Sequence, residues 1–372
     1  MSGTRPRLRS LGVDGVAPAL RAAGVSGAGG GGFPTYAKWT DLAEASYLLV
    51  NHQESEPNCC VDRWLGRERA DALAELFDAL LAVALDVVVV GAKRRDRDPW
   101  VAPLEEATDA TVYEPGDLPV DPASESGVVV AYTDDTYEYG MENVLLQTVA
   151  DVVIGKDLPV DYGWIVQNTE TLHNVHRALT ENRPVLDTYV HVDGVLGGGE
   201  RVPNRLFEAP VGTSAADLLA AAGVDPDLGD GRVLAAGGPG WCFELQRPPD
   251  RWGVRKRTNC VLVLPADAVA DNTYGNGRVN VLDAFEWPRP GSAVSPRRRH
   301  PDRVHVPVVT DDDYDGVAPS RPTVGLGDTV DRGDVVAEPA SGDERFSVAH
   351  HAPLAGEVVD VTRREVELRR TD

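Results

Sequence analysis

Short apolar runs alternate with amphipathic stretches over the first part of the chain. Residues 46–50 (SYLLV) and 86–91 (DVVVVG) are continuous apolar runs, which predict buried strands. Residues 67–85, between them, carry apolar side chains at intervals of three and four, which predicts a helix. A strand, a helix and a strand in this order form a βαβ unit, so we expect a parallel sheet with a right-handed crossover.

The same signals continue beyond this unit. Residues 127–131 (GVVVA) and 162–166 predict two more strands, and residues 140–154 and 170–180 predict helices. Thr169 is the expected N-cap of the second helix, because its hydroxyl can accept a backbone N–H.

The pattern changes after residue 184, so we take residues 1–184 as one α/β domain with a parallel-sheet core. Residues 185–265 contain alternating segments and a short helix, which indicates a small α+β domain. Residues 266–303 are rich in Pro, Arg and Asp and are predicted to be a linker. In residues 304–372 short strands alternate with turns, which indicates a small all-β barrel or sandwich.

The charge of the chain excludes one class of function. The 372 residues carry a formal net charge of −23, and most of the basic residues are Arg. Non-specific nucleic-acid binding needs a basic surface, so we expect no nucleic-acid partner. An acidic, Lys-poor chain is typical of proteins kept soluble in high salt, where self-repulsion is screened. A halophilic source is therefore a hypothesis, and full stability without salt would count against it.

The cysteines and the apolar runs limit cofactors and location. The four cysteines, Cys59, Cys60, Cys242 and Cys260, contain no CxxC pair, so we expect no local iron–sulfur or zinc motif and no metal site. The N-terminus lacks the apolar core of a signal peptide. Residues 80–92, the longest apolar run, are too short to span a bilayer. We expect a cytoplasmic protein whose attachment to a membrane, if any, is through a partner complex.

A glycine-rich segment, residues 24–32 (GVSGAGGGG), precedes the sequence FPTYAKW. Glycines let the backbone approach a ligand and present N–H groups to an anion. Lys38 can add an ammonium to a phosphate contact, and Phe33 and Trp39 offer flat faces to a ring. A flexible linker is the alternative for a bare glycine run, but FPTYAKW is unlike a linker. No GK[ST] follows and no clear strand precedes, so the segment is neither a Walker loop nor a dinucleotide fingerprint.

A polar segment, residues 51–63 (NHQESEPNCCVDR), follows the first predicted strand. It lies at the carboxyl end of a parallel strand, where open α/β sheets bind ligands. Its carboxylates can accept hydrogen bonds from ribose hydroxyls and carboxamides. A solvated acidic loop is the alternative, but Pro57 and the Asp62/Arg63 pair favour a binding role.

The segments GGGGFPTYAKW and LLVNHQESEPNCCVDR resemble the flavin-binding (51 kDa or F) subunit of respiratory complex I and the related RnfC and PduS proteins. The family patterns read GRGGAGFPTGxKW and NADESEPGTxKDR. Residues 137–143 (YEYGMEN) are similar to the family element Y-x-x-G-x-E, and residues 166–175 (VQNTETLHNV) to NNVETLxNV. Four motifs in the family's order over residues 24–175 make this resemblance specific.

The resemblance implies a protein that binds FMN and NAD(P)H, and it assigns residues motif by motif. The implied FMN-binding residues are Gly27, Gly29, Gly30, Gly31 and Lys38 for the phosphate and ribityl chain, and Asn51, Gly140, Glu142, Asn168 and Thr169 around the flavin. The implied dinucleotide-binding residues are Phe33, Glu54 and Glu56. No catalytic side chain is implied, because hydride chemistry belongs to the cofactor.

The chain departs from the family pattern at three positions. His52 and Gln53 replace small or acidic residues, which we expect to alter dinucleotide affinity. Gln167 replaces the first Asn of NNVET, which we expect to weaken a flavin contact.

Later segments also resemble parts of this family. Residues 185–265 resemble its ligand-binding β-grasp (SLBB) domain, with GGPG at 237–240 and KRTNC at 256–260. Residues 304–372 resemble a barrel-sandwich (biotinyl/lipoyl-like) hybrid domain. No lysine lies between Pro339 and His351, so we expect no biotin or lipoate there.

The family's iron–sulfur module is not recognisable, since no cysteine follows Cys260. We therefore expect an FMN-dependent NAD(P)H-oxidising subunit that passes electrons to an iron–sulfur partner protein. Two alternatives stay open: a PduS-like reductase of cobalamin or another cofactor, and a degenerate, non-catalytic scaffold. The acceptor, the choice of NADH or NADPH and the oligomeric state are not predicted.

Overall fold

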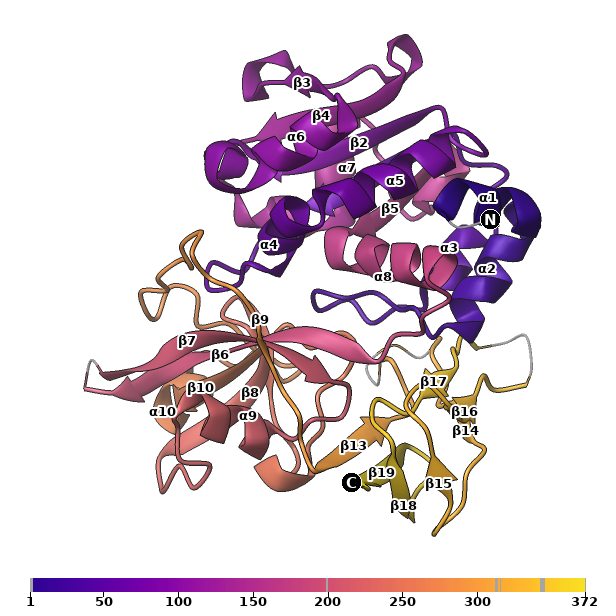
Figure 1. Cartoon of the computed structure of the whole chain (residues 1–372). Helices are drawn as coiled ribbons and strands as arrows, with labels where there is room; N and C mark the ends of the chain where they lie inside the picture. Colours follow the sequence, from indigo (N-terminus) through magenta and orange to yellow (C-terminus); the bar gives the residue numbers. More distant parts are fainter. Residues whose placement is uncertain (1–2, 199, 312–313, 315, 342–344, 372) are drawn as a thin grey trace. The chain divides into compact units, whose positions relative to one another are not determined.

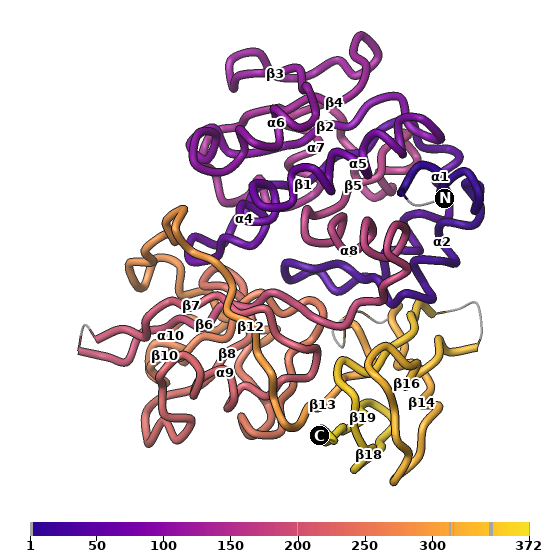
Figure 2. Tube along the Cα trace, in the orientation of Figure 1, coloured from indigo at the N-terminus to yellow at the C-terminus, as the bar shows by residue number. Residues whose placement is uncertain are grey.

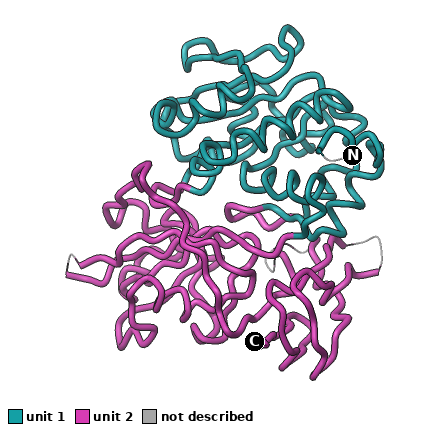
Figure 3. The backbone as a smooth tube through the Cα atoms, in the orientation of Figure 1, with its two compact units in different colours: residues 1–27, 34–55, 61–184 teal, residues 28–33, 56–60, 185–372 magenta. Residues whose placement is uncertain are grey.

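A computed structural model describes residues 3–198, 200–311, 314, 316–341 and 345–371, and the chain divides into two compact units (Figures 1 and 3). Unit 1 comprises Met1–Gly27, Pro34–Ser55 and Val61–Pro184, and unit 2 comprises Ala28–Phe33, Glu56–Cys60 and Val185–Asp372. The units part after residue 184, where the sequence pattern changes. Two short segments of the first 184 residues nonetheless belong to unit 2.

Unit 1 is built on a parallel sheet in the order β3-β4-β2-β1-β5. Its strands are β1 (Tyr47–His52), β2 (Val87–Lys93), β3 (Thr111–Tyr113), β4 (Gly127–Thr133) and β5 (Trp164–Asn168). The four predicted strands are confirmed as β1, β2, β4 and β5, and the parallel pairing of β1 with β2 is confirmed. The short edge strand β3 was not predicted, because it lacks an apolar run.

Helices cover both faces of this sheet. They are α1 (Thr4–Leu11), α2 (Val13–Ala22), α3 (Thr35–Trp39), α4 (Val61–Glu68), α5 (Ala70–Leu81), α6 (Ala102–Thr108), α7 (Glu142–Ala150) and α8 (Thr169–Thr180). Helix α7 buries Leu145, Leu146 and Val149 in a cluster with Leu49 and other strand residues. Successive strand side chains alternate between faces, so Leu48 lies on the other face, and α5 and α8 also contact the sheet.

Two helix boundaries differ from the sequence prediction. The helix expected over residues 67–85 is divided between α4 and α5, which are separated at Arg69. The N-cap of α8 is Asn168 and not Thr169: the Asn168 side chain accepts a hydrogen bond from the Thr171 N–H at 3.2 Å. Thr169 is the first residue of the helix, and its hydroxyl is 2.8 Å from His52 Nδ1.

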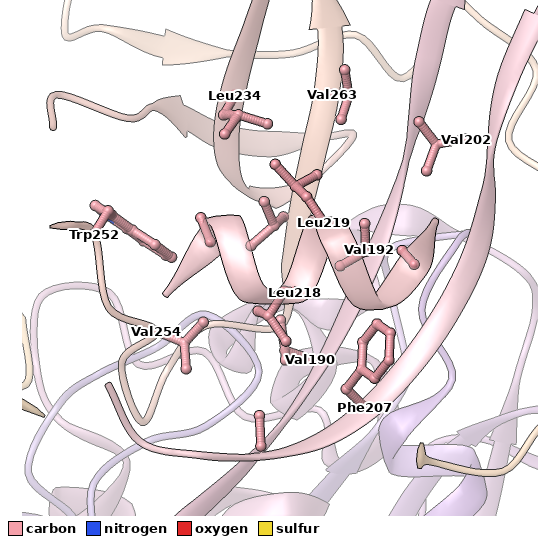
Figure 4. Packing of buried hydrophobic residues seen from close by; sticks show 14 residues of the cluster. Val190, Val192, Val202, Phe207, Leu218, Leu219, Leu234, Trp252, Val254 and Val263 are labelled. Atoms are coloured by element: carbon pink, nitrogen blue, oxygen red, sulfur yellow. The ribbon is translucent and has the colours of Figure 1, made fainter. Parts of the chain in front are cut away.

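Unit 2 contains a mixed sheet in the order β11-β9-β8-β10-β6-β7-β12. Its strands are β6 (Asp187–Gly197), β7 (Glu200–Pro210), β8 (Arg232–Gly238), β9 (Trp241–Glu244), β10 (Cys260–Pro265), β11 (Arg278–Val279) and β12 (Arg297–Arg298). Helix α9 (Ala215–Ala222) begins after the N-cap Ser214 and buries Leu218 and Leu219 against this sheet (Figure 4).

Residues 266–303, predicted to be a linker, contain regular structure. They include α10 (Ala266–Asp271) and strands β11 and β12, both of which pair within the sheet. Val279, Val281 and Trp287 are buried in one cluster. These isolated apolar side chains, in a stretch rich in Pro and Arg, pack onto the sheet and hold the segment in place.

The last part of unit 2 is all-β, as expected from its short strands and turns. One sheet has the order β13-β19-β18-β15 and the other β14-β16-β17. The strands are β13 (Arg303–Pro307), β14 (Arg321–Pro322), β15 (Thr329–Val330), β16 (Val335–Glu338), β17 (His350–His351), β18 (Gly356–Val361) and β19 (Glu365–Arg370). A buried cluster that includes Val306, Val336, Leu354 and Leu368 forms their core.

Within the described residues, we find no helix with both the length and the apolar character needed to cross a bilayer.

Candidate functional site

The carboxyl ends of β1 and β5 mark the point where the strand order of unit 1 reverses (Figure 2). The chain passes from β1 to β2 on one side, while β5 pairs with β1 on the other side. Asn51 on β1 and Asn168 on β5 are register partners there. In open parallel sheets, ligands bind in the crevice at such a point.

Lys38 on α3 is held at this edge by an ion pair with Glu142, at the start of α7. The Lys38 ammonium also donates to the Val166 carbonyl of β5 at 3.4 Å. The side chains of Lys38 and Glu142 are 31% and 38% exposed. A partly exposed ammonium at the end of a sheet is accessible to an anion.

Asn51 links β1 to the turn η5 (Tyr137–Gly140). Its Nδ2 donates to the Gly140 carbonyl at 2.8 Å, and its Oδ1 accepts the Gln53 N–H at 3.3 Å. A Cβ added to Gly140 would overlap the Ser55 hydroxyl and lie 2.8 Å from Ser55 Cβ. The close approach of this turn to Ser55 therefore requires glycine.

We expect Gly140→Ala to weaken FMN binding by about 10-fold, because Ser55 or the turn must shift and the Asn51 hydrogen bond is then strained. The measurement is FMN titration followed by flavin fluorescence. Gly116→Ala is the matched control, since Gly116 is also in a short turn of unit 1 and a Cβ there meets nothing within 4 Å. Equal affinity in both variants would contradict this assignment.

Asn168 is oriented by Asp62 on α4. Its Nδ2 donates to Asp62 Oδ2 at 2.7 Å, and Asp62 Oδ1 accepts the Glu170 N–H at 3.1 Å. Burial, together with the nearby carboxylates of Glu54 and Glu170, raises the pKa of Asp62 well above its usual range. Arg63, the next residue in the sequence, pairs with Asp96 at 3.5 Å.

Glu54, predicted to face a dinucleotide, holds the start of α4. Its Oε2 accepts the Asp62 N–H at 2.7 Å and the Arg63 N–H at 3.4 Å. Glu54 is only 9% exposed and has a positive φ of 41°. Burial raises the pKa of its carboxyl despite the opposing charge of Arg63.

His52 is buried behind this edge and contacts Thr169, a predicted flavin-lining residue. Its Nδ1 is 2.8 Å from Thr169 Oγ1, and a Cβ on Gly66 of α4 would lie 2.9 Å from its Nε2. Burial, assisted by the charge of Arg63, lowers the pKa of His52 to about 4. His52 is therefore neutral at neutral pH and supports Thr169 by packing and hydrogen bonding.

The lowered pKa of His52 predicts that the free energy of unfolding decreases in acid. The pKa of His52 is near 6.5 in the unfolded chain and about 4 in the folded protein. The contribution of neutral, buried His52 to the free energy of unfolding is therefore full above pH 6.5 and is lost as the pH falls through 4. The lost free energy of unfolding is roughly 3 kcal/mol. We expect His52→Gln to flatten the pH dependence of urea unfolding between pH 6.5 and 4. The exposed His300→Gln variant should keep the wild-type slope, and an unchanged slope in His52→Gln would refute the assignment.

The glycine-rich segment is divided between the units. In unit 1, Ser26 and Pro34 form an antiparallel bridge, and Gly27 is the last residue of its segment. In unit 2, Gly29 and Gly30 have positive φ values of 63° and 104°. The Gly30 N–H donates to the Arg257 carbonyl at 2.9 Å.

One further backbone hydrogen bond and two aromatic contacts define this part of unit 2. The Gly31 N–H donates to the Ala28 carbonyl at 3.3 Å. The Phe33 ring packs edge-on against Tyr314 and Phe346, at centroid distances of 5.5 and 5.1 Å. Thus the amides of Gly30 and Gly31 have backbone partners in this conformation, and Phe33 has aromatic ones.

Glu56, the other acidic residue predicted to face a dinucleotide, belongs to unit 2. It is 8% exposed, and its Oε2 accepts the Gly240 N–H at 2.9 Å. The same segment is held by Asn58, whose Nδ2 donates to Asp193 Oδ2 at 3.1 Å. Sequence spacing gave no signal for these contacts, because they join residues 135 and 184 positions apart.

The predicted site residues thus fall into two groups. The structure brings together Lys38, Asn51, Gly140, Glu142, Asn168 and Thr169 in unit 1, and it places Gly29, Gly30, Gly31, Phe33 and Glu56 in unit 2. In the part of the chain that the structure describes, no group of three or more His, Cys, Asp or Glu residues is arranged to hold a metal ion.

The sequence matches one protein-family model and is similar to known oxidoreductase and reductase proteins. Residues 20–177 match a family model described as the Nuo51 FMN-binding domain. One protein of the ion-translocating oxidoreductase complex of Pseudomonas aeruginosa is 33% identical over 248 residues, which are 65% of this chain and 29% of that protein. Cobalamin reductase PduS of Salmonella typhimurium is 30% identical over 262 residues, 69% of this chain and 51% of that protein.

The fold of this chain is similar to that of solved structures. An NAD+-reducing [NiFe]-hydrogenase in the air-oxidised state matches with a TM-score of 0.52 and 20% identity, over 73% of this chain and 50% of that chain. The chain spans about half or less of the length of these relatives. The mixed α/β architecture with a parallel-sheet core is therefore shared.

Proposed function

Because this chain belongs to the flavin-binding family of the complex I 51 kDa subunit, RnfC and PduS, we propose that it is an FMN-dependent oxidoreductase that oxidises NAD(P)H and passes electrons to a partner protein. The observation that supports this most strongly is the gathering of Lys38, Asn51 and Asn168 at the carboxyl ends of β1 and β5. These residues come from motifs far apart in the sequence, and the folded sheet brings them to one edge.

The residues at this edge fit a bound FMN. A phosphate needs a cation, which Lys38 supplies from a partly exposed position. A flavin ring needs hydrogen-bonding groups, and among the described residues the buried Ser55 Oγ and Gln167 Nε2 have no hydrogen-bond partner. Buried polar atoms are rarely left unpaired, so these two support a polar ligand at this edge. Gln167, a departure from the family pattern, thus keeps an amide donor.

Each residue at the edge has a distinct task in this proposal. Lys38 holds the FMN phosphate in unit 1, and Glu142 orients the Lys38 ammonium. The family resemblance also assigns Gly27, Gly29, Gly30 and Gly31 to the phosphate and ribityl chain. Asn51, Gly140, Asn168 and Thr169 line the flavin; their side chains or carbonyls are fixed in advance by hydrogen bonds to one another and to Asp62 and His52. Such preorganisation lowers the entropic cost of binding. When bound, FMN accepts a hydride and can release the two electrons singly.

For the nicotinamide dinucleotide we propose a contact with Glu54 in unit 1; the family resemblance also assigns Phe33 and Glu56, which belong to unit 2. Glu54 uses Oε2 for the start of α4, so its Oε1 is the atom we assign to the dinucleotide. Phe33 supplies an apolar ring. No protein side chain is assigned as an acid, base or nucleophile.

We also propose domain types and a partner for the rest of the chain. Residues 1–184 form the FMN/NADH-binding domain, residues 185–265 are SLBB-like, and residues 304–372 are barrel-sandwich-like without an attached cofactor. The electrons pass to an iron–sulfur partner protein, which also provides any association with a membrane. The relatives that belong to multiprotein complexes support this role.

The experiment is reconstitution with FMN followed by anaerobic titration with NADH and, in parallel, NADPH. The proposal predicts a flavin spectrum that is bleached by at least one of the two dinucleotides. Reduced protein should then be reoxidised by an iron–sulfur protein faster than by a cobalamin. Faster reaction with cobalamin would favour a PduS-type reductase instead, and failure to take up flavin would leave only the scaffold.

A further inference from the structure

A cavity of about 480 Å³ lies in unit 2 and contains none of the residues assigned above to flavin or dinucleotide. Four of its lining side chains are arginines, Arg247, Arg251, Arg255 and Arg364. The chain as a whole carries a net charge of −23. Four guanidinium groups around one cavity therefore reverse the prevailing sign of charge.

Two of the three carboxylates that line the cavity are paired with arginines. Glu365 accepts two hydrogen bonds from Arg247, at 2.5 and 3.2 Å. Glu367 accepts one at 2.6 Å from Arg303, which is not part of the lining. The third carboxylate of the lining is Asp360. Four arginines and three carboxylates thus line the cavity, and Arg247 and Arg303 are paired with two of the carboxylates.

A buried histidine adds polar capacity at the same wall. His305 is 4% exposed and lines the cavity. Its Nδ1 lies 3.6 Å from Glu365 and 3.7 Å from Glu367, so the ring is placed beside both carboxylates.

The rest of the lining is suited to an organic group. Trp252, Pro307 and Val309 are buried apolar residues of the lining, and Thr362 provides a hydroxyl. A volume of about 480 Å³ is within the range of small-molecule sites. Guanidinium groups match phosphate oxygens in geometry and charge.

We propose that this cavity, with Arg251, Arg255 and Arg364 facing Trp252, is a binding site for a small organic phosphate ester. The arginines bind the phosphate, and the organic part lies along the apolar wall. The site is separate from the proposed flavin-binding residues, because none of its lining residues is in the flavin motifs.

The test is calorimetric titration of the full chain with 5′-AMP and with inorganic pyrophosphate, in low salt. The double variant Arg251→Gln/Arg364→Gln should weaken binding of both probes by at least 10-fold. The control is Arg321→Gln, an exposed arginine of unit 2 paired with Glu338, which should bind both probes as the wild type does. Raising the salt concentration should weaken wild-type binding.

Three results would overturn the proposal. They are absence of AMP and pyrophosphate binding at millimolar concentrations, equal binding by the double variant, and tighter binding of an acidic peptide than of either phosphate. Melting temperatures establish that the variants are folded, and their FMN affinity should equal that of the wild type. A chain that fails to bind FMN yet binds AMP through these arginines would refute the flavin proposal alone.

Discussion

Replacing Lys38 with methionine is expected to raise the Kd for FMN by about 100-fold or more. The ammonium is the cation we assign to the FMN phosphate, and a charge-assisted hydrogen bond contributes roughly 1.5–3 kcal/mol. Its loss also leaves Glu142 without its ion-pair partner, and this carboxylate then repels the phosphate. Methionine keeps the length of the side chain, so α3 should stay in place. The measurement is fluorescence titration with FMN.

Lys156→Met is the matched control, because Lys156 is an exposed lysine of the same unit. It should bind FMN with wild-type affinity. A double variant that also replaces Glu142 with Gln should recover part of the loss, since the repelling carboxylate is removed. Unchanged FMN affinity in Lys38→Met would show that the phosphate is bound elsewhere.

Replacing Gly237 with alanine is expected to lower the free energy of unfolding of unit 2 by about 3–5 kcal/mol. Gly237 has a positive φ of 118°, and a Cβ there would overlap the Trp241 carbonyl oxygen and lie 2.8 Å from Cys242 Cα. Both atoms belong to the backbone of β9, which pairs with β8 and cannot yield without breaking the hairpin. The adjoining turn holds Glu56 through the Gly240 N–H, so the segment of residues 56–60 should loosen as well.

Gly277→Ala separates backbone strain from steric overlap. Gly277 has a positive φ of 79°, but nothing lies within 4 Å of an added Cβ. This variant should lose only about 1 kcal/mol, the cost of the conformation alone. Urea unfolding followed by tryptophan fluorescence measures both variants, and equal losses would contradict the steric argument.

Strands β1 and β2 could be predicted because each is a continuous apolar run. Residues 48–50 and 87–91 are buried, so their composition alone identifies β1 and β2. The segment of residues 266–303 could not be predicted in the same way. Its apolar residues are isolated, and only contact with the folded sheet gives Trp287 a buried position.

The motifs predicted which residues meet at the edge of the sheet but not how their polar atoms are paired. Asn51 and Asn168 lie at the carboxyl ends of β1 and β5, so their placement follows from the parallel topology. The capping of α4 by Glu54 and the bond from Asn168 to Asp62 depend on three-dimensional contacts. The donation of the Gly30 N–H to Arg257 joins residues more than 220 positions apart, and no local pattern reports such a pair.

The most direct measurement of the central claim compares FMN with riboflavin, which has the same ring but no phosphate. If Lys38 binds the phosphate, wild-type protein should bind FMN at least 100-fold more tightly than riboflavin. The Lys38→Met variant should bind the two flavins with nearly equal affinity. Equal and weak binding of both flavins by the wild type, or no binding at all, would contradict the account.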